Sequence, residues 1–175
     1  MARKKIREYE AKQIIAENIE DIKVNSTLVS EKTIVEELPS KYPGLLTSSL
    51  VIKPDMLFGK RKKLGLVKVN IDWNEVKDYL NQFRNKEFSI DKTKDILTHF
   101  LIEPYIEHQE EYYLAIKSER EHDTIYFSDK GGIDVEENWD NVVKIEIPTL
   151  NEINEANFQE KIIIKDENNK ELIIN

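Results

Sequence analysis

Cysteine is absent from the 175 residues, and glycine and proline are scarce, with five residues of each. Without cysteine, the chain can form no disulfide framework, zinc–thiolate site, iron–sulfur cluster or cysteine nucleophile. No apolar run approaches the roughly 18 residues that a membrane-spanning helix requires. The sequence therefore excludes thiol chemistry and predicts no association with a membrane, and we expect a cytoplasmic location.

The charge of the chain is negative overall but unevenly distributed. Together, 34 acidic and 26 basic side chains give a formal net charge of −8 at pH 7. This excess of acid argues against a general nucleic-acid binder, because phosphate neutralisation requires surplus positive charge. Residues 53–68, however, hold six bases and one acid. A concentrated positive segment in an acidic chain is a candidate anion site.

The spacing of apolar residues predicts a mixture of helices and strands. We expect an amphipathic helix over residues 3–22, a loop around Pro39–Gly44, and a second helix after Asp72, where Glu75 completes a capping box. Short strands are expected at residues 50–52, 64–69, 100–102, 112–116, 124–127 and 144–147, with hairpins at 112–127 and in the tail at 161–174. Without a strict βαβ order, the fold class is α+β.

The positive segment has two interpretations. Lys53, at the end of an apolar strand, can present a fixed ammonium group to an anion. The loop from Gly59 to Gly65 can surround phosphate oxygens with side chains and backbone N–H groups. Alternatively, the segment is a lysine-rich hairpin tip that faces water, as most charge runs do.

The segment that begins at Glu103-Pro104-Tyr105-Ile106 also has two interpretations. An apolar strand followed by a proline-stiffened segment can form a flat slot for an aromatic base, and a carboxylate there can accept a hydrogen bond from a ribose hydroxyl or an exocyclic amine. The alternative is an exposed loop with ordinary packing of Tyr105 and Ile106.

Neither a catalytic residue nor a metal site is predicted within the chain. The three histidines show no spacing typical of metal ligands. Asp134, Glu136 and Glu137 carry the charge that Mg²⁺ prefers, but three carboxylates on a surface loop are commoner than a ligand set.

Four blocks in register give the chain a family resemblance. Three of them resemble the start of ATP-citrate lyase, and the first block of the chain resembles the opening helix of the related succinyl-CoA synthetase β subunit. The blocks are Glu8-Tyr9-Glu10-Ala11-Lys12-Gln13, Leu50–Asp55 with Lys63–Asn70, Phe100–Tyr105 with Glu110–Tyr113, and Gly131–Val135. Lys53-Pro54-Asp55 favours the citrate branch, because succinyl-CoA synthetases have a glycine-richer loop at this point.

The resemblance implies an ATP-grasp fold, in which two small α/β subdomains hold ATP between their sheets. Residues 20–97 would form the first subdomain, and residues 1–19 with 98–175 an incomplete second one. The later half of the ATP-grasp domain, with its magnesium motif, is missing. We therefore expect the chain to be the amino-terminal piece of a larger subunit, truncated at its carboxyl end and inactive by itself.

The resemblance also implies an ATP site. Lys53 matches the family lysine that contacts the phosphates, and Arg61 and Lys62 align with the phosphate-loop positions. Lys62 stands where the family usually has glycine, so any need for a positive φ there would be costly. The expected ATP-binding residues are Lys53, Arg61, Lys62, Glu103, Pro104, Ile106 and Glu111.

At the other end of the nucleotide, Pro104 and Ile106 align with the linker whose backbone meets adenine, and Glu111 with the acid at the nucleoside. The cofactors are thus expected to be ATP and Mg²⁺, the latter with ligands outside this chain. The decisive expectation is that Lys53 lies in a cationic pocket and does not point into bulk solvent, remote from the 103–111 segment.

By this resemblance, ATP phosphorylates a histidine on another domain or subunit. The phosphoryl group activates citrate, and citryl-CoA is formed and cleaved to acetyl-CoA and oxaloacetate. Citrate and CoA would bind to the missing domains, and no nucleic acid or membrane partner is expected. Two alternatives stay open at this point. One is the ATP-grasp part of a succinyl- or malyl-CoA synthetase, and the other is a fragment that binds nucleotide or supports assembly without catalysis.

Overall fold

The chain forms two compact units, Met1–Ile106 and Glu107–Asn175. The computed structural model describes residues 4–90, 93–132, 139–150 and 162. Helices and strands are mixed, as the sequence predicts. The boundary between the units does not coincide with the subdomain limits expected from the sequence, and the division into ATP-grasp subdomains stays a prediction. In the described part of the chain, every helix is too short or too polar to cross a lipid bilayer.

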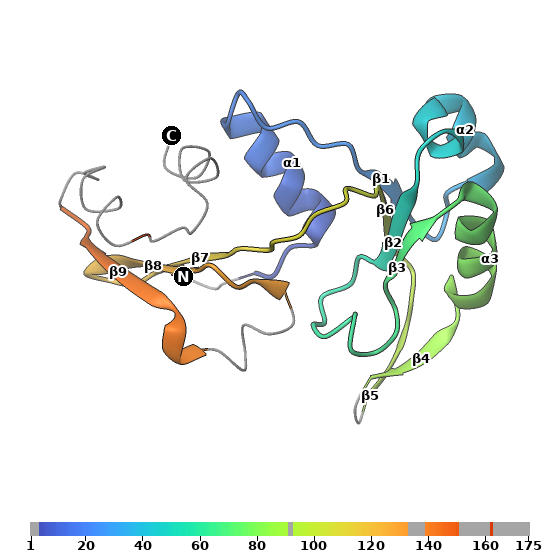
Figure 1. The fold of residues 1–175 in the computed structure, drawn as a ribbon. Coiled ribbons are helices and arrows are strands. Elements are labelled where there is room, and N and C mark those ends of the chain that lie inside the picture. Colours follow the sequence, from blue (N-terminus) through green and yellow to red (C-terminus); the bar gives the residue numbers. More distant parts are fainter. Residues whose placement is uncertain (1–3, 91–92, 133–138, 151–161, 163–175) are drawn as a thin grey trace. The chain divides into compact units, whose positions relative to one another are not determined.

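The first unit contains three α-helices and six strands within its described residues (Figure 1). In chain order these are α1 (Glu8–Asn18), β1 (Thr27–Val29), α2 (Leu38–Lys41), β2 (Leu50–Pro54), β3 (Lys68–Ile71), α3 (Trp73–Phe83), β4 (Glu87–Ile90), β5 (Thr93–Ile96) and β6 (Phe100–Pro104), with 3-10 helices η1 (Val35–Glu37) and η2 (Pro43–Leu46) on either side of α2. Strands β4 and β5 form a separate antiparallel hairpin.

The main sheet of this unit has the strand order β1-β6-β2-β3, and all of its pairs are antiparallel. Because side chains alternate between the two faces of a strand, Leu50, Ile52 and Ile102 share one face and are buried in the core with α3. Lys53 and Glu103 therefore share the opposite face. Two residues 50 positions apart in the sequence are brought together by this register.

Helix α3 begins directly after Asp72, as the sequence predicts. The Asp72 side chain accepts the backbone N–H of Glu75 at 2.9 Å, and the Glu75 side chain accepts the backbone N–H of Asp72 at 2.9 Å. Val76 and Leu80 are buried, as the apolar stripe predicts. Tyr79 is buried with them, and its hydroxyl donates to the carbonyl of Leu66 at 2.9 Å.

The predicted strand at residues 64–69 is wrong at its start, and β3 begins only at Lys68. Residues 61–64 form a helical turn that ends at Gly65, whose φ is 70°. The N–H of Gly65 donates to the Lys62 carbonyl and that of Leu66 to the Arg61 carbonyl, each at 3.0 Å. This is the Schellman pattern of a helix end, in which glycine takes the left-handed conformation.

The loop expected around Pro39–Gly44 is also wrong, because the segment is helical in two short pieces, α2 and η2. Each piece has proline in its first turn. Proline is tolerated there because its missing N–H would have no partner inside the helix. Helix α1 is shorter than the expected 3–22, since Ile19 is already extended.

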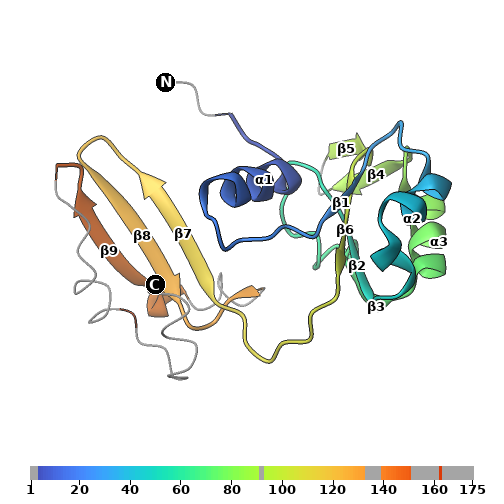
Figure 2. The ribbon, with the colours of Figure 1, turned by 90° about the horizontal axis from the view of Figure 1, so that it is seen from above.

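The second unit contains an antiparallel sheet of the order β7-β8-β9, whose strands lie side by side in Figure 2. The strands are β7 (Tyr113–Ser118), β8 (His122–Ser128) and β9 (Val143–Pro148), with the 3-10 helix η4 (Trp139–Asn141) before β9. The predicted hairpin and the last predicted strand are thus confirmed. Phe127, Ile145 and Ile162 form the centre of its core. The expected tail hairpin and Asp134, Glu136 and Glu137 lie outside the described residues.

Candidate functional site

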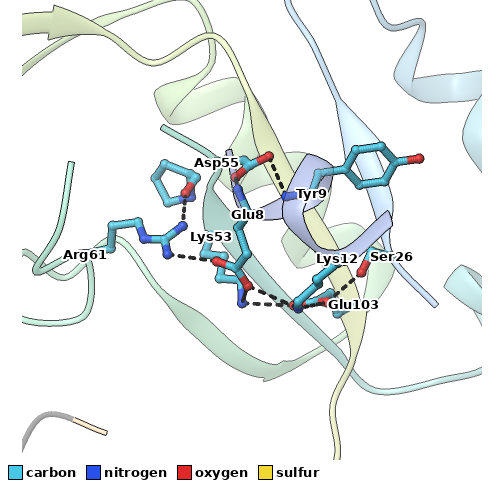
Figure 3. A network of polar contacts seen from close by, with 9 residues as sticks. Glu8, Tyr9, Lys12, Ser26, Lys53, Asp55, Arg61 and Glu103 are labelled. Carbon is cyan, nitrogen blue, oxygen red and sulfur yellow. Dashed lines mark hydrogen bonds and ion pairs between the residues drawn. The ribbon is translucent and has the colours of Figure 1, made fainter. Parts of the chain in front are cut away.

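Lys53 lies in a cluster of charged side chains on the outer face of the main sheet (Figure 3). Its Nζ is 2.6 Å from Glu8 Oε1 and 2.9 Å from Glu103 Oε2. The Lys53 side chain is only 19% exposed. The ammonium group is therefore held between two carboxylates. As expected from the sequence, it does not point into bulk solvent, and it contacts the first residue of the 103–111 segment.

Glu103 is held from two further directions. Lys12, on α1, forms an ion pair with Glu103 Oε1, and Ser26 donates its hydroxyl proton to the same oxygen at 2.6 Å. Lys12 Nζ is also 3.1 Å from Glu8 Oε1, one helical turn away. The oxygens of Glu103 thus accept from protein donors in this structure, and its expected role in ATP binding stays a prediction.

Arg61 completes the cluster from the helical turn 61–64. Its guanidinium donates to the Pro54 carbonyl at 2.7 Å and to Glu8 Oε2 at 2.8 Å. Lys53 and Arg61, eight positions apart, therefore meet on the same Glu8 carboxylate, one on each oxygen. The structure brings together two of the three cations that the family resemblance assigns to the phosphates, Lys53 and Arg61.

Asp55 fixes the start of α1 to the end of β2. It is fully buried, and its two carboxylate oxygens accept the backbone N–H groups of Glu8 at 2.8 Å and Tyr9 at 3.2 Å. The first N–H groups of a helix have no partner inside it, and a carboxylate there is favoured by the helix dipole as well. Lys53-Pro54-Asp55 thus contributes a cation, a carbonyl acceptor and the anchor of α1.

The charges of the cluster shift the pKa values of its acids and of Lys12. Burial by itself would raise the pKa of Glu8, but hydrogen bonds and charges from Lys53, Arg61 and Lys12 outweigh it and lower that pKa to about 2. Burial would also raise the pKa of Glu103, but Lys12, Ser26 and Lys53 outweigh burial and lower that pKa. Burial would lower the pKa of Lys12, yet Glu103 and Glu8 raise it. All of these groups are therefore charged at neutral pH.

Among the side chains joined by ion pairs, three cations face two carboxylates, which leaves one net positive charge. The third carboxylate of the network, Asp55, is buried and bonded to the first N–H groups of α1. The exposed side chains of Lys60 and Lys62 stand on the neighbouring loop and add to the positive potential. A partly buried group of fixed cations that is not fully neutralised is suited to bind an anion.

Lys62 occupies its position without backbone strain. Among the described non-glycine residues, a positive φ occurs at Lys60, Asn70 and Asn85. Lys62 lies instead within the helical turn, where any residue can follow the backbone. Lys62 therefore avoids the cost of a positive φ that was expected where the family has glycine. In this turn, Gly65 is the glycine that takes the left-handed conformation.

Pro104 and Ile106 lie at the end of β6. Pro104 pairs with Leu50 and borders a cavity of about 290 Å³ in which Ile102 and Leu45 also take part. This cavity is on the face of the sheet that carries Leu50 and Ile102, and thus away from Lys53. Ile106 is 74% exposed. Their role at a nucleotide base stays a prediction.

Glu111 belongs to the second unit. Its Oε1 is 2.9 Å from His108 Nε2, and its backbone carbonyl accepts the N–H of Gly131 at 2.5 Å. A Cβ on Gly132 would lie 2.1 Å from Glu111 Oε2, and the φ of Gly132 is 71°. The glycine pair therefore packs directly on this acid, which explains why two glycines stand there.

The described residues offer no metal centre of their own. They include no group of three or more His, Cys, Asp or Glu side chains placed to hold a metal ion. Glu8 and Glu103 are engaged with cations, so they do not form a free carboxylate pair. These residues alone do not fit a Mg²⁺ site, and we derive no step through the metal.

Glu8 and Lys12 are the site residues that the sequence reasoning did not assign. Their block resembles the opening helix of the related succinyl-CoA synthetase β subunit, and this resemblance does not place it beside Lys53. The available signal was their spacing, since residues four apart lie on one face of a helix. No sequence pattern reports that this face meets β2 and β6.

Comparison with known proteins identifies the family. The family model described as the ATP-citrate synthase ATP-grasp domain matches residues 2–175. The chain therefore belongs to the ATP-citrate synthase ATP-grasp family. The resemblance found in the sequence, the ATP-grasp fold and the citrate branch are thereby confirmed.

Individual members of the ATP-citrate synthase family support this assignment. The chain is 46% identical over 154 residues to ATP-citrate synthase alpha chain protein 2 of Oryza sativa subsp. japonica, covering 85% of this chain and 36% of that one. The corresponding Arabidopsis thaliana protein is 44% identical over the same length and share. The chain thus spans about a third of the length of the curated relatives it matches.

A solved structure of the family agrees with the fold. The ATP citrate lyase from Methanothrix soehngenii, in complex with citrate and coenzyme A, superposes with a TM-score of 0.84 at 38% sequence identity. The match covers 97% of this chain and 41% of that one.

Proposed function

We propose that this chain binds ATP through the cation cluster of Lys53 and Arg61, as the nucleotide-binding part of an ATP-citrate lyase. The observation that carries the proposal is that these two side chains converge on one carboxylate and keep a net positive charge with Lys12. The membership in the ATP-citrate synthase ATP-grasp family supports the choice of ATP among anions.

Each cation has a defined task in this proposal. Lys53 supplies a point charge for phosphate oxygens, and Arg61 supplies a planar group already oriented by the Pro54 carbonyl. In phosphoryl transfer the protein contributes mainly positioning and charge stabilisation. Lys62, Pro104, Ile106 and Glu111 are proposed contacts of the phosphates, the base and the nucleoside.

We propose the wider activity for the whole protein and not for these residues by themselves. In it, the phosphoryl group of ATP passes through a histidine on another domain or subunit and activates citrate. Citryl-CoA is formed and cleaved to acetyl-CoA and oxaloacetate. The related archaeal enzyme was solved with citrate and coenzyme A, which supports these substrates. Mg²⁺ would accompany ATP, held by residues outside this chain.

The test is ATP binding by the Lys53→Ala variant, measured by isothermal titration calorimetry. Loss of a charge-assisted hydrogen bond should weaken ATP binding by about 1.5–3 kcal/mol. Lys41→Ala is the matched control, because Lys41 is exposed and its ion pair, at 3.3 Å, is with its helical neighbour Glu37. An unchanged affinity in Lys53→Ala, with the control also unchanged, would contradict the proposal.

A further inference from the structure

Glu8 contacts both of the cations that are proposed to bind phosphate. Its Oε1 is 2.6 Å from Lys53 Nζ and its Oε2 is 2.8 Å from an Arg61 guanidinium nitrogen. A single carboxylate thus bridges the two cations with one oxygen on each. A phosphate group bridges two cations in the same way, with similar distances. An arriving polyphosphate and Glu8 therefore compete for the same donors.

The two carboxylates of the cluster stand on different elements, and each has three partners: Lys53, Lys12 and Arg61 for Glu8, and Lys53, Lys12 and Ser26 for Glu103. Glu103 stands on the central strand β6, and Ser26 and Lys12 both contact its Oε1. Glu8 stands on the first turn of α1, and its side chain is 24% exposed. Because Glu8 is at a helix start and is slightly more exposed than Glu103 (24% against 18%), a rotation of its side chain can carry it toward solvent while Glu103 stays within the sheet.

Glu8 can keep its ion pair with Lys12 when it leaves Lys53 and Arg61. Lys12 Nζ lies 3.1 Å from Glu8 Oε1, in the i,i+4 relation that α-helices favour. Rotation of the Glu8 side chain can release Lys53 and Arg61 without leaving the carboxylate unpaired. The backbone need not move, since Asp55 holds the N–H groups of Glu8 and Tyr9 independently of the Glu8 side chain.

We propose that Glu8 is a built-in competitor of the nucleotide, a carboxylate that occupies Lys53 and Arg61 until a polyphosphate displaces it. The proposal rests on the proposed function, because it concerns the same cations. Its consequence is that Glu8 weakens polyphosphate binding and keeps the two cations in place while no anion is bound. Inorganic phosphate, with fewer charged oxygens, would displace it less readily than a triphosphate chain.

The experiment compares the full chain with Glu8→Gln and Glu10→Gln, titrated by calorimetry with inorganic tripolyphosphate and, separately, with ATP. Glutamine keeps the size of residue 8 but removes its charge. Glu10 is on the same helix, and its carboxylate accepts the backbone N–H of Arg7 at 3.2 Å, so it is the matched control for net charge. We expect Glu8→Gln to bind tripolyphosphate about tenfold more tightly than wild type, the factor that corresponds to about 1.4 kcal/mol.

The outcomes are distinct. Tighter binding by Glu8→Gln, with Glu10→Gln equal to wild type, supports the proposal. Equal or weaker binding by Glu8→Gln, equal gains in both variants, or no tripolyphosphate binding by any protein overturns it. If tripolyphosphate binds and ATP binds no more tightly than tripolyphosphate, the proposed function fails. The comparison of tripolyphosphate affinities between wild type and Glu8→Gln then still decides the role of Glu8.

A second variant guards against misfolding. Glu8→Asp keeps the charge and the helix but shortens the side chain by one methylene, so it no longer reaches both cations. We expect a smaller gain in tripolyphosphate affinity, about threefold, and an affinity equal to wild type would overturn the proposal. Circular dichroism checks that each variant is folded.

Discussion

The backbone N–H of Glu8 donates to Asp55 Oδ1 at 2.8 Å, which joins the start of the first helix to the end of a central strand. The two residues are 47 positions apart in the sequence. This hydrogen bond sets where the Glu8 side chain begins, and therefore where it meets Lys53. The relation between a buried acid and a helix end thus determines the geometry of the charged cluster.

Replacing Asp55 should destabilise the first unit. Asp55→Ala leaves the N–H groups of Glu8 and Tyr9 without their acceptor and opens a small cavity, so we expect the free energy of unfolding to fall by about 3 kcal/mol. Asp55→Asn keeps one acceptor oxygen and should cost less. Urea denaturation measures both, and equal stability of Asp55→Ala and wild type would show that the anchor contributes nothing.

The stability of the chain should depend on acid through Glu8. Its pKa is lowered to about 2 in the folded state from an ordinary value of 4.5. A lowered folded-state pKa contributes stability above the unfolded value, and this contribution is lost as pH falls from 4.5 toward 2. We expect the difference in unfolding free energy between wild type and Glu8→Gln to shrink across that window. Denaturation series between pH 7 and pH 2.5 test this, and a constant difference would argue against it.

The capping box of α3 offers a prediction independent of the site. Asp72→Ala removes the acceptor for the Glu75 N–H, so we expect a loss of about 1 kcal/mol in unfolding free energy. Asp78→Ala, at an exposed position within the same helix, is the control and should change stability little. Both are measured by urea denaturation, and a similar loss in the two variants would show that capping is not the cause.

Gly132 should not tolerate a side chain. Gly132→Ala combines a φ of 71° with a Cβ only 2.1 Å from Glu111 Oε2, so we expect a loss of at least about 1 kcal/mol and a displaced Glu111 carboxylate. Gly44→Ala is the control, because nothing lies within 4 Å of its added Cβ. Thermal denaturation compares the two, and NMR of the Glu111 side chain detects the displacement.

Much of the fold could be predicted because local patterns agree with the final structure. The Asp72–Glu75 capping box and the β7–β8 hairpin involve few neighbouring residues, and packing reinforces both. The prediction of a strand from Leu64 failed because apolar residues on either side of Gly65 suit a strand as well as a helix end. Proline in the first turn of α2 was interpreted as a loop for a similar reason.

The site could be predicted only in part. Lys53 and Arg61 were found through charge and family resemblance, and the structure places them together. Glu8 and Lys12 were missed as site residues because their contact with β2 and β6 depends on the anchor at Asp55, a buried hydrogen bond between distant segments. Such a contact leaves no periodic signal in the sequence.

The Schellman turn that ends at Gly65 has a consequence for how fast the proposed polyphosphate ligand would bind. Because Gly65 takes the left-handed conformation, Lys62 can follow the helical turn and hold an extra ammonium group in the water without strain. Such a charge acts on a polyanion before any contact is made, by long-range attraction that accelerates diffusional encounter. Salt screens this attraction beyond about 10 Å. The association rate should therefore change with ionic strength more than the affinity of the final complex does.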